Sequence, residues 1–343
     1  IIASHFGRPK GKAVPDMSLR PVRGKLAELT GREVQWASDC VGTEAREKSQ
    51  KLEAGEILLL ENLRYHSGEE ANDEEFATRL ASLAEAYVND AFGASHRAHA
   101  SIYALPRHYG ADASAAGLLL VREIEFLQKV VEVDQNERPF VAILGGAKIK
   151  GKIEPLEAMI RVADHVLIGG GMANTFLAAQ GVEMGSSLVD RDSVELAGRL
   201  LEEGQDRIEL PSDLVVTDSI DEPTVVETVS TDDGVPPSLM AVDVGPVTAQ
   251  AYEGRIATGK TVFWNGPMGV FEKEAFSSGT MKVAGAIGSS RAVSIVGGGE
   301  SVEAIKASGF ADRITHISTG GGASLEFISG AQLPGVEVLR KGS

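Results

Sequence analysis

The chain of 343 residues lacks paired cysteines and long hydrophobic runs, and its first residues do not form a signal-peptide pattern. Its single cysteine, Cys40, cannot form an internal disulfide, which fits a reducing compartment, and we interpret it as a small buried residue. No apolar run approaches the ~20 residues that are needed to span a bilayer. Residues 1–5 have neither the charged start nor the long apolar core of a signal peptide. These absences predict a cytoplasmic protein that does not enter a membrane.

Basic residues are also few, with 33 Lys and Arg against 49 Asp and Glu and a formal net charge of −16. Such an excess of negative charge argues against wide contacts with nucleic acid or with acidic membrane surfaces. It does not exclude a local basic cleft, and the basic residues do cluster in the sequence. We therefore expect small-molecule substrates as partners, and neither nucleic acid nor membrane.

Short apolar runs alternate with amphipathic stretches along the whole chain. In the first half, 57–60 and 86–88 are predicted strands and 72–84 is a predicted helix. In the second half, buried strands are predicted at 140–144, 166–168, 214–217, 261–264, 292–296 and 315–318. This alternation predicts an α/β fold with mainly parallel sheets that are flanked by helices. A long amphipathic helix at 118–133 marks the boundary between two domains, the number that the chain length suggests.

The stretch Gly145–Lys152 is the clearest sign of phosphate chemistry. It directly follows the predicted strand 140–144; its glycines let backbone N–H groups approach an anion, and its lysines supply positive charge. The stretch fits the first seven positions of a P-loop, G-x-x-x-x-G-K. The eighth should be Ser or Thr, to place a hydroxyl on magnesium, and here it is Ile153. The sequence therefore predicts phosphate binding but argues against an ordinary P-loop.

Glycine clusters follow the strands of the second half repeatedly. They lie at 145–146, 169–171, 266 with 269, 297–299 and 320–322. In an open parallel sheet, ligands bind at the carboxyl ends of the strands. Glycine-rich turns that recur at this edge of the sheet predict a nucleotide-binding site.

Basic residues follow the strands of the first half in the same way. They are His5, Arg8, Arg64, His96 and Arg97. The planar guanidinium group suits the oxygen atoms of carboxylates and phosphates, so the first half is predicted to bind a small anionic substrate. Two sites on two domains suggest a transfer reaction that is completed by domain closure.

An NAD-dependent dehydrogenase is an alternative that the α/β pattern also fits. It requires G-x-G-x-x-G on a first βαβ unit with an acidic residue ~20 residues further on, and the sequence has no convincing instance.

No Ser/His/Asp constellation or pair of catalytic carboxylates stands out in the sequence. Phosphoryl transfer needs none, because it relies on positioning and on cations or N–H dipoles around the developing charge. His66 and His99 are interpreted as structural.

Seven motifs together resemble those of the phosphoglycerate kinase family. They are Ser4–Gly11, Glu61–His66, Asn89–Gly93 with His96–His99, Gly145–Lys148, Gly169–Ala173, Trp264–Glu272 and Ser318–Ser324. They stand in the family's order and cover the whole chain. The resemblance implies two Rossmann-like three-layer α/β/α domains joined by a long interdomain helix. It also implies a monomer that transfers a phosphoryl group between 1,3-bisphosphoglycerate and ADP, giving 3-phosphoglycerate and ATP, with Mg²⁺ as cofactor.

The resemblance further divides the chain into functional parts. It implies a phosphoglycerate-binding domain at 1–120, an interdomain helix at 121–135, a nucleotide-binding domain at 136–318, and a segment at 319–343 that returns towards the N-terminal domain. In the family pattern a first strand with Asp-x-Asn and a further arginine lie upstream of Ile1. We therefore expect an N-terminally truncated chain without its first strand and helix. The alternative function is then a nucleotide-binding but catalytically impaired fragment.

Individual residues also receive roles from the resemblance. The phosphoglycerate would be bound by His5, Phe6, Gly7, Arg8, Arg64 and Arg97. The nucleotide would be bound by Gly146, Ala147, Lys148, Lys152, Gly169, Gly170, Val242, Asn265, Pro267, Glu272, Gly298, Gly299, Glu300 and Ser301. The catalytic residues would be Lys148, Arg8, Gly298 and Gly321, and Lys148 would contact the migrating phosphoryl group. Glu300 stands where the family usually has Asp, and its carboxylate would bind Mg²⁺ with shifted geometry.

Overall fold

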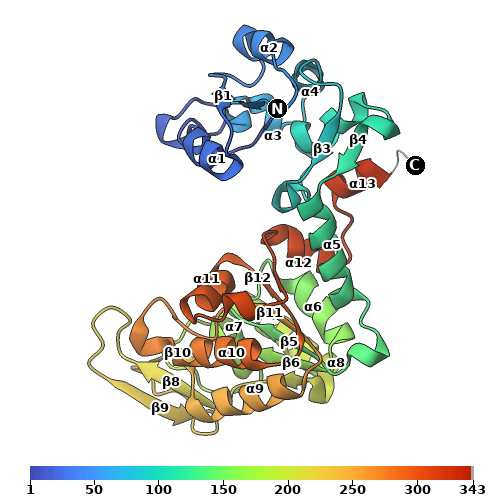
Figure 1. The fold of residues 1–343 in the computed structure, drawn as a ribbon. Helices are drawn as coiled ribbons and strands as arrows, with labels where there is room; N and C mark the ends of the chain where they lie inside the picture. The colour runs from blue at the N-terminus through green and yellow to red at the C-terminus, as the bar shows by residue number, and fades with distance from the viewer. Residues whose placement is uncertain (341–343) are drawn as a thin grey trace. The chain divides into compact units, whose positions relative to one another are not determined.

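A computed structural model describes residues 1–340, which fall into two units. Unit 1 comprises residues 1–121 and 332–340, and unit 2 comprises residues 122–331. Helix α5 (Leu118–Val131) begins in unit 1 and continues into unit 2 (Figure 1). The functional division into four parts remains a prediction. Among the described residues, no helix is long and apolar enough to cross a membrane.

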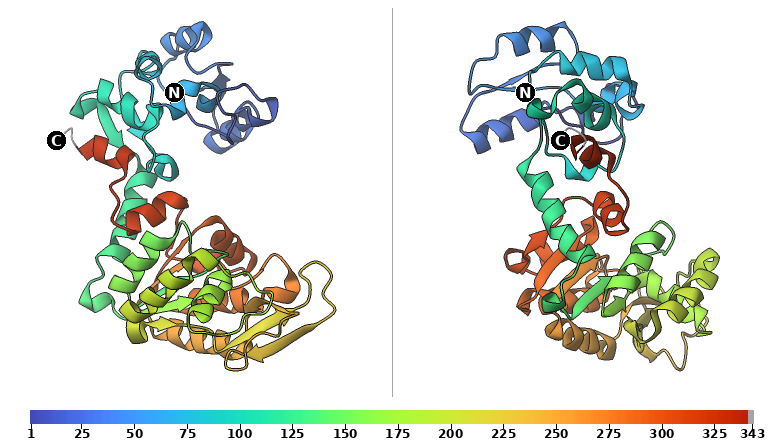
Figure 2. Two further views of the ribbon diagram at one scale, coloured as in Figure 1. Left: turned by 180° about the vertical axis from the view of Figure 1, so that it is seen from behind. Right: turned by 90° about the vertical axis from the view of Figure 1, so that its right-hand side faces the viewer.

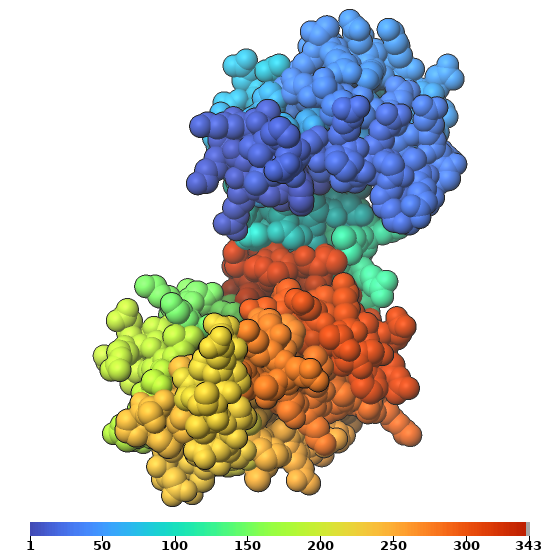
Figure 3. Space-filling model, turned by 90° about the vertical axis from the view of Figure 1, so that its left-hand side faces the viewer, coloured from blue at the N-terminus to red at the C-terminus, as the bar shows by residue number. Residues whose placement is uncertain are grey.

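Unit 1 contains two short parallel sheets. Strand β1 (Val34–Trp36) pairs with β2 (Ile57–Leu59), and β3 (Tyr87–Asn89) pairs with β4 (Ser114–Ala116). The other helices of the unit are α1 (Val22–Thr30), α2 (Thr43–Gln50), α3 (Ser67–Glu70), α4 (Glu74–Ala81) and α13 (Pro334–Arg340). Ile2 forms a parallel bridge with Leu59, so the loop that follows Ile2 leaves the sheet at the carboxyl end of β2. The first residues of the chain lie at the surface of unit 1, where Figure 3 shows them in dark blue.

Helix α4 illustrates how the sequence builds the core of unit 1. The carboxylate of Asp73 caps the helix by accepting a hydrogen bond of 2.7 Å from the backbone N–H of Phe76. Phe76, Ala77 and Leu80 recur at helical spacing and are buried in one apolar cluster. Cys40 is buried in the same cluster, as predicted, and burial raises the pKa of its thiol.

Unit 2 is built on a six-stranded parallel sheet, as the strand–helix alternation predicts. The strands are β5 (Phe140–Leu144), β6 (His165–Ile168), β7 (Ile208–Glu209), β11 (Thr261–Asn265), β12 (Val293–Gly297) and β13 (His316–Ile317), in the spatial order β13-β12-β11-β5-β6-β7. Helices α9 (Pro246–Thr258), α10 (Ser278–Ser289) and α11 (Gly299–Ala307) cover one face of the sheet (Figure 1). Helices α6 (Ile153–Val162), α7 (Gly170–Ala179) and α8 (Val194–Gly204) cover the other face (Figure 2), and α12 (Gly322–Ile328) contacts α6.

The prediction of a parallel strand at 214–217 is wrong in direction. Strand β8 (Asp213–Thr217) lies in a separate antiparallel sheet, between β10 (Met240–Val244) and β9 (Val226–Ser230). The physical reason is that β9 follows β8 after a short loop with no crossover helix, and only antiparallel neighbours can be joined in this way. The apolar run of β8 alone does not distinguish the two directions, because β8 is mostly buried like the parallel strands.

The order of the strands fixes where a ligand can bind in unit 2. From β5 the chain proceeds to β6 and β7 on one side of the sheet, whereas β11, β12 and β13 follow on the other side. The direction of progress therefore reverses between β5 and β11, and ligands bind at such a switch point, beyond the carboxyl ends of the strands. Every residue of β5 and β11 is buried, so these two strands hold the turns after Leu144 and Asn265 rigidly side by side.

Candidate functional site

Five basic side chains of unit 1 lie within electrostatic range of one another. They are His5, Arg8, Arg64, Arg97 and His99, which we call the basic cluster. They come from the loop after Ile2, the 3₁₀ turn η2 (Leu63–Tyr65) after β2, and the loop after β3. The structure thus brings together the predicted residues His5, Arg8, Arg64 and Arg97.

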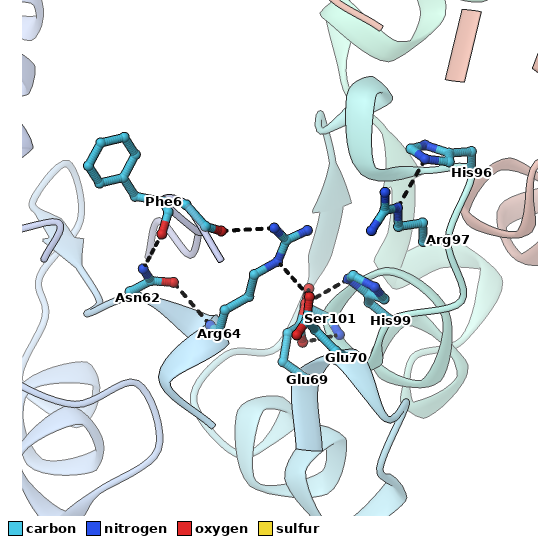
Figure 4. A network of polar contacts seen from close by, with 10 residues as sticks. Phe6, Asn62, Arg64, Glu69, Glu70, His96, Arg97, His99 and Ser101 are labelled. Carbon is cyan, nitrogen blue, oxygen red and sulfur yellow. Dashed lines mark hydrogen bonds and ion pairs between the residues drawn. The ribbon is translucent and has the colours of Figure 1, made fainter. Parts of the chain in front are cut away.

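Asn62 holds the parts of the basic cluster in place (Figure 4). Its side-chain amide donates hydrogen bonds of 2.8 Å to the backbone carbonyl groups of Phe6 and Met17, and its Oδ1 accepts one of 3.0 Å from the backbone N–H of Arg64. The guanidinium of Arg64 then donates a hydrogen bond of 3.0 Å to the carbonyl group of Gly7, which adopts a φ of +66° that favours glycine. The predicted substrate residues Phe6 and Gly7 therefore contribute backbone carbonyls, and the Phe6 ring is 54% exposed.

Arginines carry the charge of the cluster at neutral pH. Partial desolvation of the imidazole and the neighbouring Arg64 lower the pKa of His5 to about 4. Burial and Arg64 also lower the pKa of His99. Both histidines are therefore neutral near pH 7, whereas Arg64 stays protonated although burial lowers the pKa of its guanidinium.

Two glutamates of α3 lie beside the cluster, and the sequence analysis missed both. Glu69 is buried and accepts hydrogen bonds from Ser101, and Glu70 lies 3.6 Å from the Nε of Arg64. No basic-residue motif points to them, and a Glu-Glu pair ordinarily indicates a solvated helix face. The only available signal is their position, five and six residues after Arg64, in the segment that follows β2.

His66 and Cys40 lie apart from the basic cluster in a contact of their own. The Nε2 of His66 lies 2.6 Å from the Oδ1 of Asp39, and this hydrogen bond lowers the pKa of the Asp39 carboxyl against the opposing effect of burial. Asp39, Cys40 and His66 are close enough together to hold a metal ion. Because the His–Asp pair already satisfies both partners, we leave the structural interpretation of His66 as it stands.

The glycine-rich turns of unit 2 contact one another through their backbones. The N–H of Gly145 donates to the carbonyl of Asn265 at 2.9 Å, that of Gly146 to Pro267 at 3.1 Å, and that of Gly170 to Met268 at 2.8 Å. A Cβ atom on Gly145 would lie 2.1 Å from the carbonyl oxygen of Pro267. Only glycine allows this approach, so the sequence motif follows from the packing of the turns. We call the turns at 145–152, 169–171, 265–269, 297–300 and 320–322 the glycine rim.

Two adjoining cavities open at the glycine rim. The first, of about 260 Å³, is mostly apolar and is lined by seven predicted nucleotide residues, Gly146, Ala147, Gly170, Val242, Pro267, Glu272 and Glu300. The second, of about 240 Å³, is lined by seven predicted residues, Lys152, Asn265, Gly298, Gly299, Glu300, Ser301 and Gly321. Glu300 borders both cavities. An apolar pocket beside a polar one suits a ligand with a flat ring and a charged tail.

The second cavity offers hydrogen-bond donors for an anion. The ammonium group of Lys152 donates to the carbonyl of Gly145 at 3.0 Å and to Oδ1 of Asn265 at 3.3 Å. Burial lowers the pKa of Lys152, an effect that Glu300 opposes. The Nδ2 of Asn265 is buried with no hydrogen-bond partner among the described residues, and helix α11 begins at this cavity. A free amide donor and a helix N-terminus both favour phosphate oxygens.

Two predicted nucleotide residues, Lys148 and Gly169, line neither cavity, and Ser301, which lines the second, uses its hydroxyl within the fold. Lys148 lines neither; it is exposed and makes no hydrogen bond or ion pair with the described residues. Gly169 is covered by Met268, since a Cβ atom on it would lie 2.5 Å from the sulfur atom. The hydroxyl of Ser301 is buried, and it accepts a hydrogen bond of 2.5 Å from the backbone N–H of Gly266.

The sequence analysis missed the apolar side chains that line the first cavity. They are Leu188, Leu214, Ile220, Met240, Val244 and Met268. They come from elements that are far apart in the sequence. A hydrophobic pattern does not separate residues that line a cavity from residues that fill the core, so no signal in the chain could have identified them.

The residues at the second cavity are compatible with Mg²⁺. Glu300 is the only carboxylate that lines this cavity among the described residues, and it is exposed there. Proteins commonly hold Mg²⁺ with one or two carboxylates together with substrate phosphates. A single glutamate beside a phosphate-binding rim therefore fits this ion.

A glycine rim at the switch point of a parallel sheet is the arrangement of nucleotide-binding α/β proteins, and a cluster of arginines for a second anion suits the class of phosphotransferases. The family model described as phosphoglycerate kinase matches residues 1–331. Phosphoglycerate kinase from Desulforudis audaxviator is 49% identical over 342 residues, which cover 99% of this chain and 86% of the relative. The one from Moorella thermoacetica is 51% identical, with the same coverage. The chain therefore belongs to the phosphoglycerate kinase family.

Solved structures agree with this assignment. The structure of phosphoglycerate kinase from Coxiella burnetii matches with a TM-score of 0.87 at 37% identity, covering 99% of this chain and 85% of that one. Phosphoglycerate kinase from Pyrococcus horikoshii also gives a TM-score of 0.87, at 32% identity and with 86% of its chain covered. The fold predicted from the resemblance, with two Rossmann-like domains, is confirmed.

Proposed function

We infer that this chain transfers a phosphoryl group between 1,3-bisphosphoglycerate and ADP, giving 3-phosphoglycerate and ATP in glycolysis. The observation that carries this inference is the match to phosphoglycerate kinases at about 50% identity over 99% of the chain. The alternative of a catalytically impaired fragment has no support in these comparisons. We propose that the protein acts as a cytoplasmic monomer.

The basic cluster is the proposed binding site for the phosphoglycerate. Arg8 and Arg97 are exposed, and Arg64 is fixed by its hydrogen bond to Gly7, so three guanidinium groups are available to carboxylate and phosphate oxygens. His5 supplies a neutral imidazole that can donate one hydrogen bond. The high charge density of the substrate is matched by fixed positive charge and not by titrating histidines.

The glycine rim is the proposed nucleotide site. The first cavity would take the adenine ring against Val242 and the backbones of Gly170 and Pro267, with Glu272 near the ribose. The second would take the phosphates on Lys152, Asn265 and the backbone N–H groups of 298–299 and 321. Glu300 would hold Mg²⁺ together with these phosphates, and the ion would neutralise charge on the nucleotide.

The reaction needs no general base from the protein, because the acceptor oxygen is already ionised in either direction. What the chain must supply is alignment and positive charge around the migrating phosphoryl group. Lys148 is the proposed source of that charge, because its ammonium group is not engaged by any described residue and lies on the turn after β5. Gly298 and Gly321, both with positive φ angles, orient further backbone N–H groups. Completion of the site by domain closure remains a prediction.

A coupled assay tests the proposed function directly. ATP consumption is followed with 3-phosphoglycerate as acceptor, and ADP binding is measured on the same preparation by calorimetry. Turnover that depends on both substrates supports the kinase. Good ADP binding without turnover above background would instead support the impaired fragment. A comparison of ADP affinity with and without Mg²⁺, in the wild type and in Glu300→Gln, tests the metal site; equal affinities in all four cases contradict it.

A further inference from the structure

The two adjacent glutamates of α3 have opposite relations to the basic cluster. Successive residues of a helix point about 100° apart, so the carboxylates of Glu69 and Glu70 make different close contacts, although the charges of both act on Arg64. In Figure 4 the two carboxylates lie beside Arg64 and His99, on the side away from Phe6. Their contacts show that the carboxylate of Glu69 is fixed by hydrogen bonds within the fold, whereas that of Glu70 is not.

The carboxylate of Glu69 is fixed within the fold. It is 3% exposed, and its two oxygen atoms accept hydrogen bonds from the backbone N–H of Ser101 at 3.0 Å and from its hydroxyl at 2.6 Å. Burial raises the pKa of Glu69, and the hydrogen bonds from Ser101 oppose the rise. This carboxylate ties α3 to the turn that begins at Ala100, directly after Arg97 and His99.

The carboxylate of Glu70 is not fixed in this way. Its side chain is 38% exposed, and its Oε1 lies 3.6 Å from Nε of Arg64, within ion-pair range but beyond a good hydrogen bond. The Nε of Arg64 is buried and has no hydrogen-bond partner among the described residues. Glu70 therefore neutralises Arg64 without satisfying its donor.

Arg64 does not depend on Glu70 for its position. Its backbone N–H is held by Asn62 and its Nη1 by the carbonyl of Gly7. If the Glu70 carboxylate rotates into solvent, the guanidinium stays where it is and offers both its charge and a free Nε–H to an incoming anion. The contact thus has the properties of a replaceable counter-ion.

We propose that Glu70 is an affinity-limiting residue of the basic cluster, which pairs with Arg64 in the empty site and yields this arginine to the carboxylate or phosphate of the substrate. The proposal rests on the proposed function, since it takes the basic cluster as the phosphoglycerate site. An exposed counter-ion of this kind weakens the binding of a multiply charged anion, because its attraction to Arg64 is lost on binding and its charge repels the ligand. Such weakening favours product release.

The test is the variant Glu70→Gln, with binding of 3-phosphoglycerate measured by calorimetry at several salt concentrations in the absence of nucleotide. We expect the Kd to fall by about threefold to fivefold at low ionic strength, the size of a typical exposed ion pair. The gain should shrink as salt is added, because salt screens half-exposed charges. The Kd for ADP should not change. Glu70→Asp, which keeps the charge but withdraws it by one methylene, should give a smaller gain.

Glu75→Gln is the matched control. Glu75 lies on the exposed side of α4 and makes no ion pair among the described residues, so its substitution removes the same charge away from Arg64. If Glu75→Gln tightens binding as much as Glu70→Gln, the effect is one of net charge and the proposal is wrong. It is equally wrong if Glu70→Gln leaves the Kd unchanged or raises it. If the wild type itself does not bind 3-phosphoglycerate, the proposed function fails first, and the role of Glu70 fails with it.

Discussion

The two candidate sites recognise anions by different means. In unit 1 the donors are side chains, chiefly Arg8, Arg64 and Arg97, which are held by Asn62 and by backbone carbonyl groups. In unit 2 they are mostly backbone N–H groups of the glycine rim, where Gly145, Gly170 and Gly266 approach neighbouring turns too closely for a Cβ atom. The first kind of site is therefore vulnerable to the loss of side-chain atoms, and the second to their addition.

The kind of donor also determines whether neighbouring charges and pH can change the affinity of each site for its anion. Side-chain donors can be paired, neutralised or displaced, as the contact of Glu70 with Arg64 shows. Backbone donors have fixed direction and no titration, so their affinity for phosphate is set when the chain folds. The four predictions that follow test this contrast, starting with the change that we expect to have the largest effect.

Lys148→Ala removes a lysine of the glycine rim whose ammonium group is exposed and makes no hydrogen bond or ion pair with the described residues. We expect kcat to fall by roughly 10²–10³-fold, the usual cost of losing a single charge or donor that acts on a transition state. The melting temperature should stay within about a degree of wild type, because the side chain makes no contact that stabilises the fold. Steady-state kinetics with thermal unfolding measures both quantities.

Lys150→Ala is the control for this prediction. Lys150 is also exposed and stands two residues away in the same turn, so its substitution by alanine removes the same charge. Equal losses of kcat in the two variants would mean that net charge in the turn matters and that Lys148 has no particular role.

Gly170→Ala adds a single methyl group to the glycine rim. The φ of Gly170 is +64°, and the new Cβ would lie 2.9 Å from the backbone N and O of Gly146 and 3.1 Å from the oxygen of Pro267. We expect a loss of about 1–2 kcal/mol from the left-handed conformation and a further loss of about 1–3 kcal/mol from overpacking. ADP affinity should fall as well, since the turns that line the cavity must move apart. Denaturant unfolding and calorimetry measure the two effects.

Gly181→Ala isolates the conformational part of this loss. Its φ is +86°, but a Cβ atom there would meet nothing within 4 Å. We expect only the cost of the left-handed conformation and unchanged ADP binding. If Gly181→Ala destabilises the protein as much as Gly170→Ala does, close packing of the turns is not what requires glycine in the rim.

The sequence predicted the glycine rim better than it predicted the surroundings of the basic cluster. Glycine turns after buried strands are visible in the chain, because both the tight backbone and the strand leave a local pattern. By contrast, Asn62, Glu69 and Ser101 act through contacts between loops that are brought together only by the fold. The direction of β8 was also hidden, since it depends on how the following loop returns to the sheet.

Arg8→Ala tests the side-chain site. Arg8 is exposed and has no hydrogen bond or ion pair to the described residues, so its removal should not disturb the fold. We expect the Kd for 3-phosphoglycerate to rise by about tenfold to a hundredfold, the size of a lost hydrogen bond to a charged group, with the Kd for ADP unchanged. Lys12→Ala, which removes an exposed charge four residues further on, should change neither. Equal effects of Arg8→Ala on both ligands would contradict the separation of the two sites.

The smallest expected effect is a difference in how pH acts on the two units. The folded-state pKa of His5 is lowered to about 4 by desolvation and by Arg64, so between pH 4 and 6.5 the unfolded chain binds more protons at this residue, and unit 1 gains stability as pH rises. In unit 2, burial raises the pKa of Asp243 to about 7, against the opposing hydrogen bonds from the N–H groups of Gly279 and Val244. Here the folded state binds more protons between about pH 4 and 7, so unit 2 loses stability as pH rises.

Hydrogen exchange followed in each unit across this range measures the contrast. The contributions of His5 and Asp243 to the free energy of opening should change with pH in opposite directions. His5→Gln should remove the pH-dependent contribution of His5, and Asp243→Asn should remove that of Asp243. The second variant should keep its local structure, because the amide oxygen of Asn can still accept the hydrogen bond from Gly279. If the wild type and Asp243→Asn show the same pH dependence in unit 2, Asp243 is ionised in the folded protein and the predicted contrast does not exist.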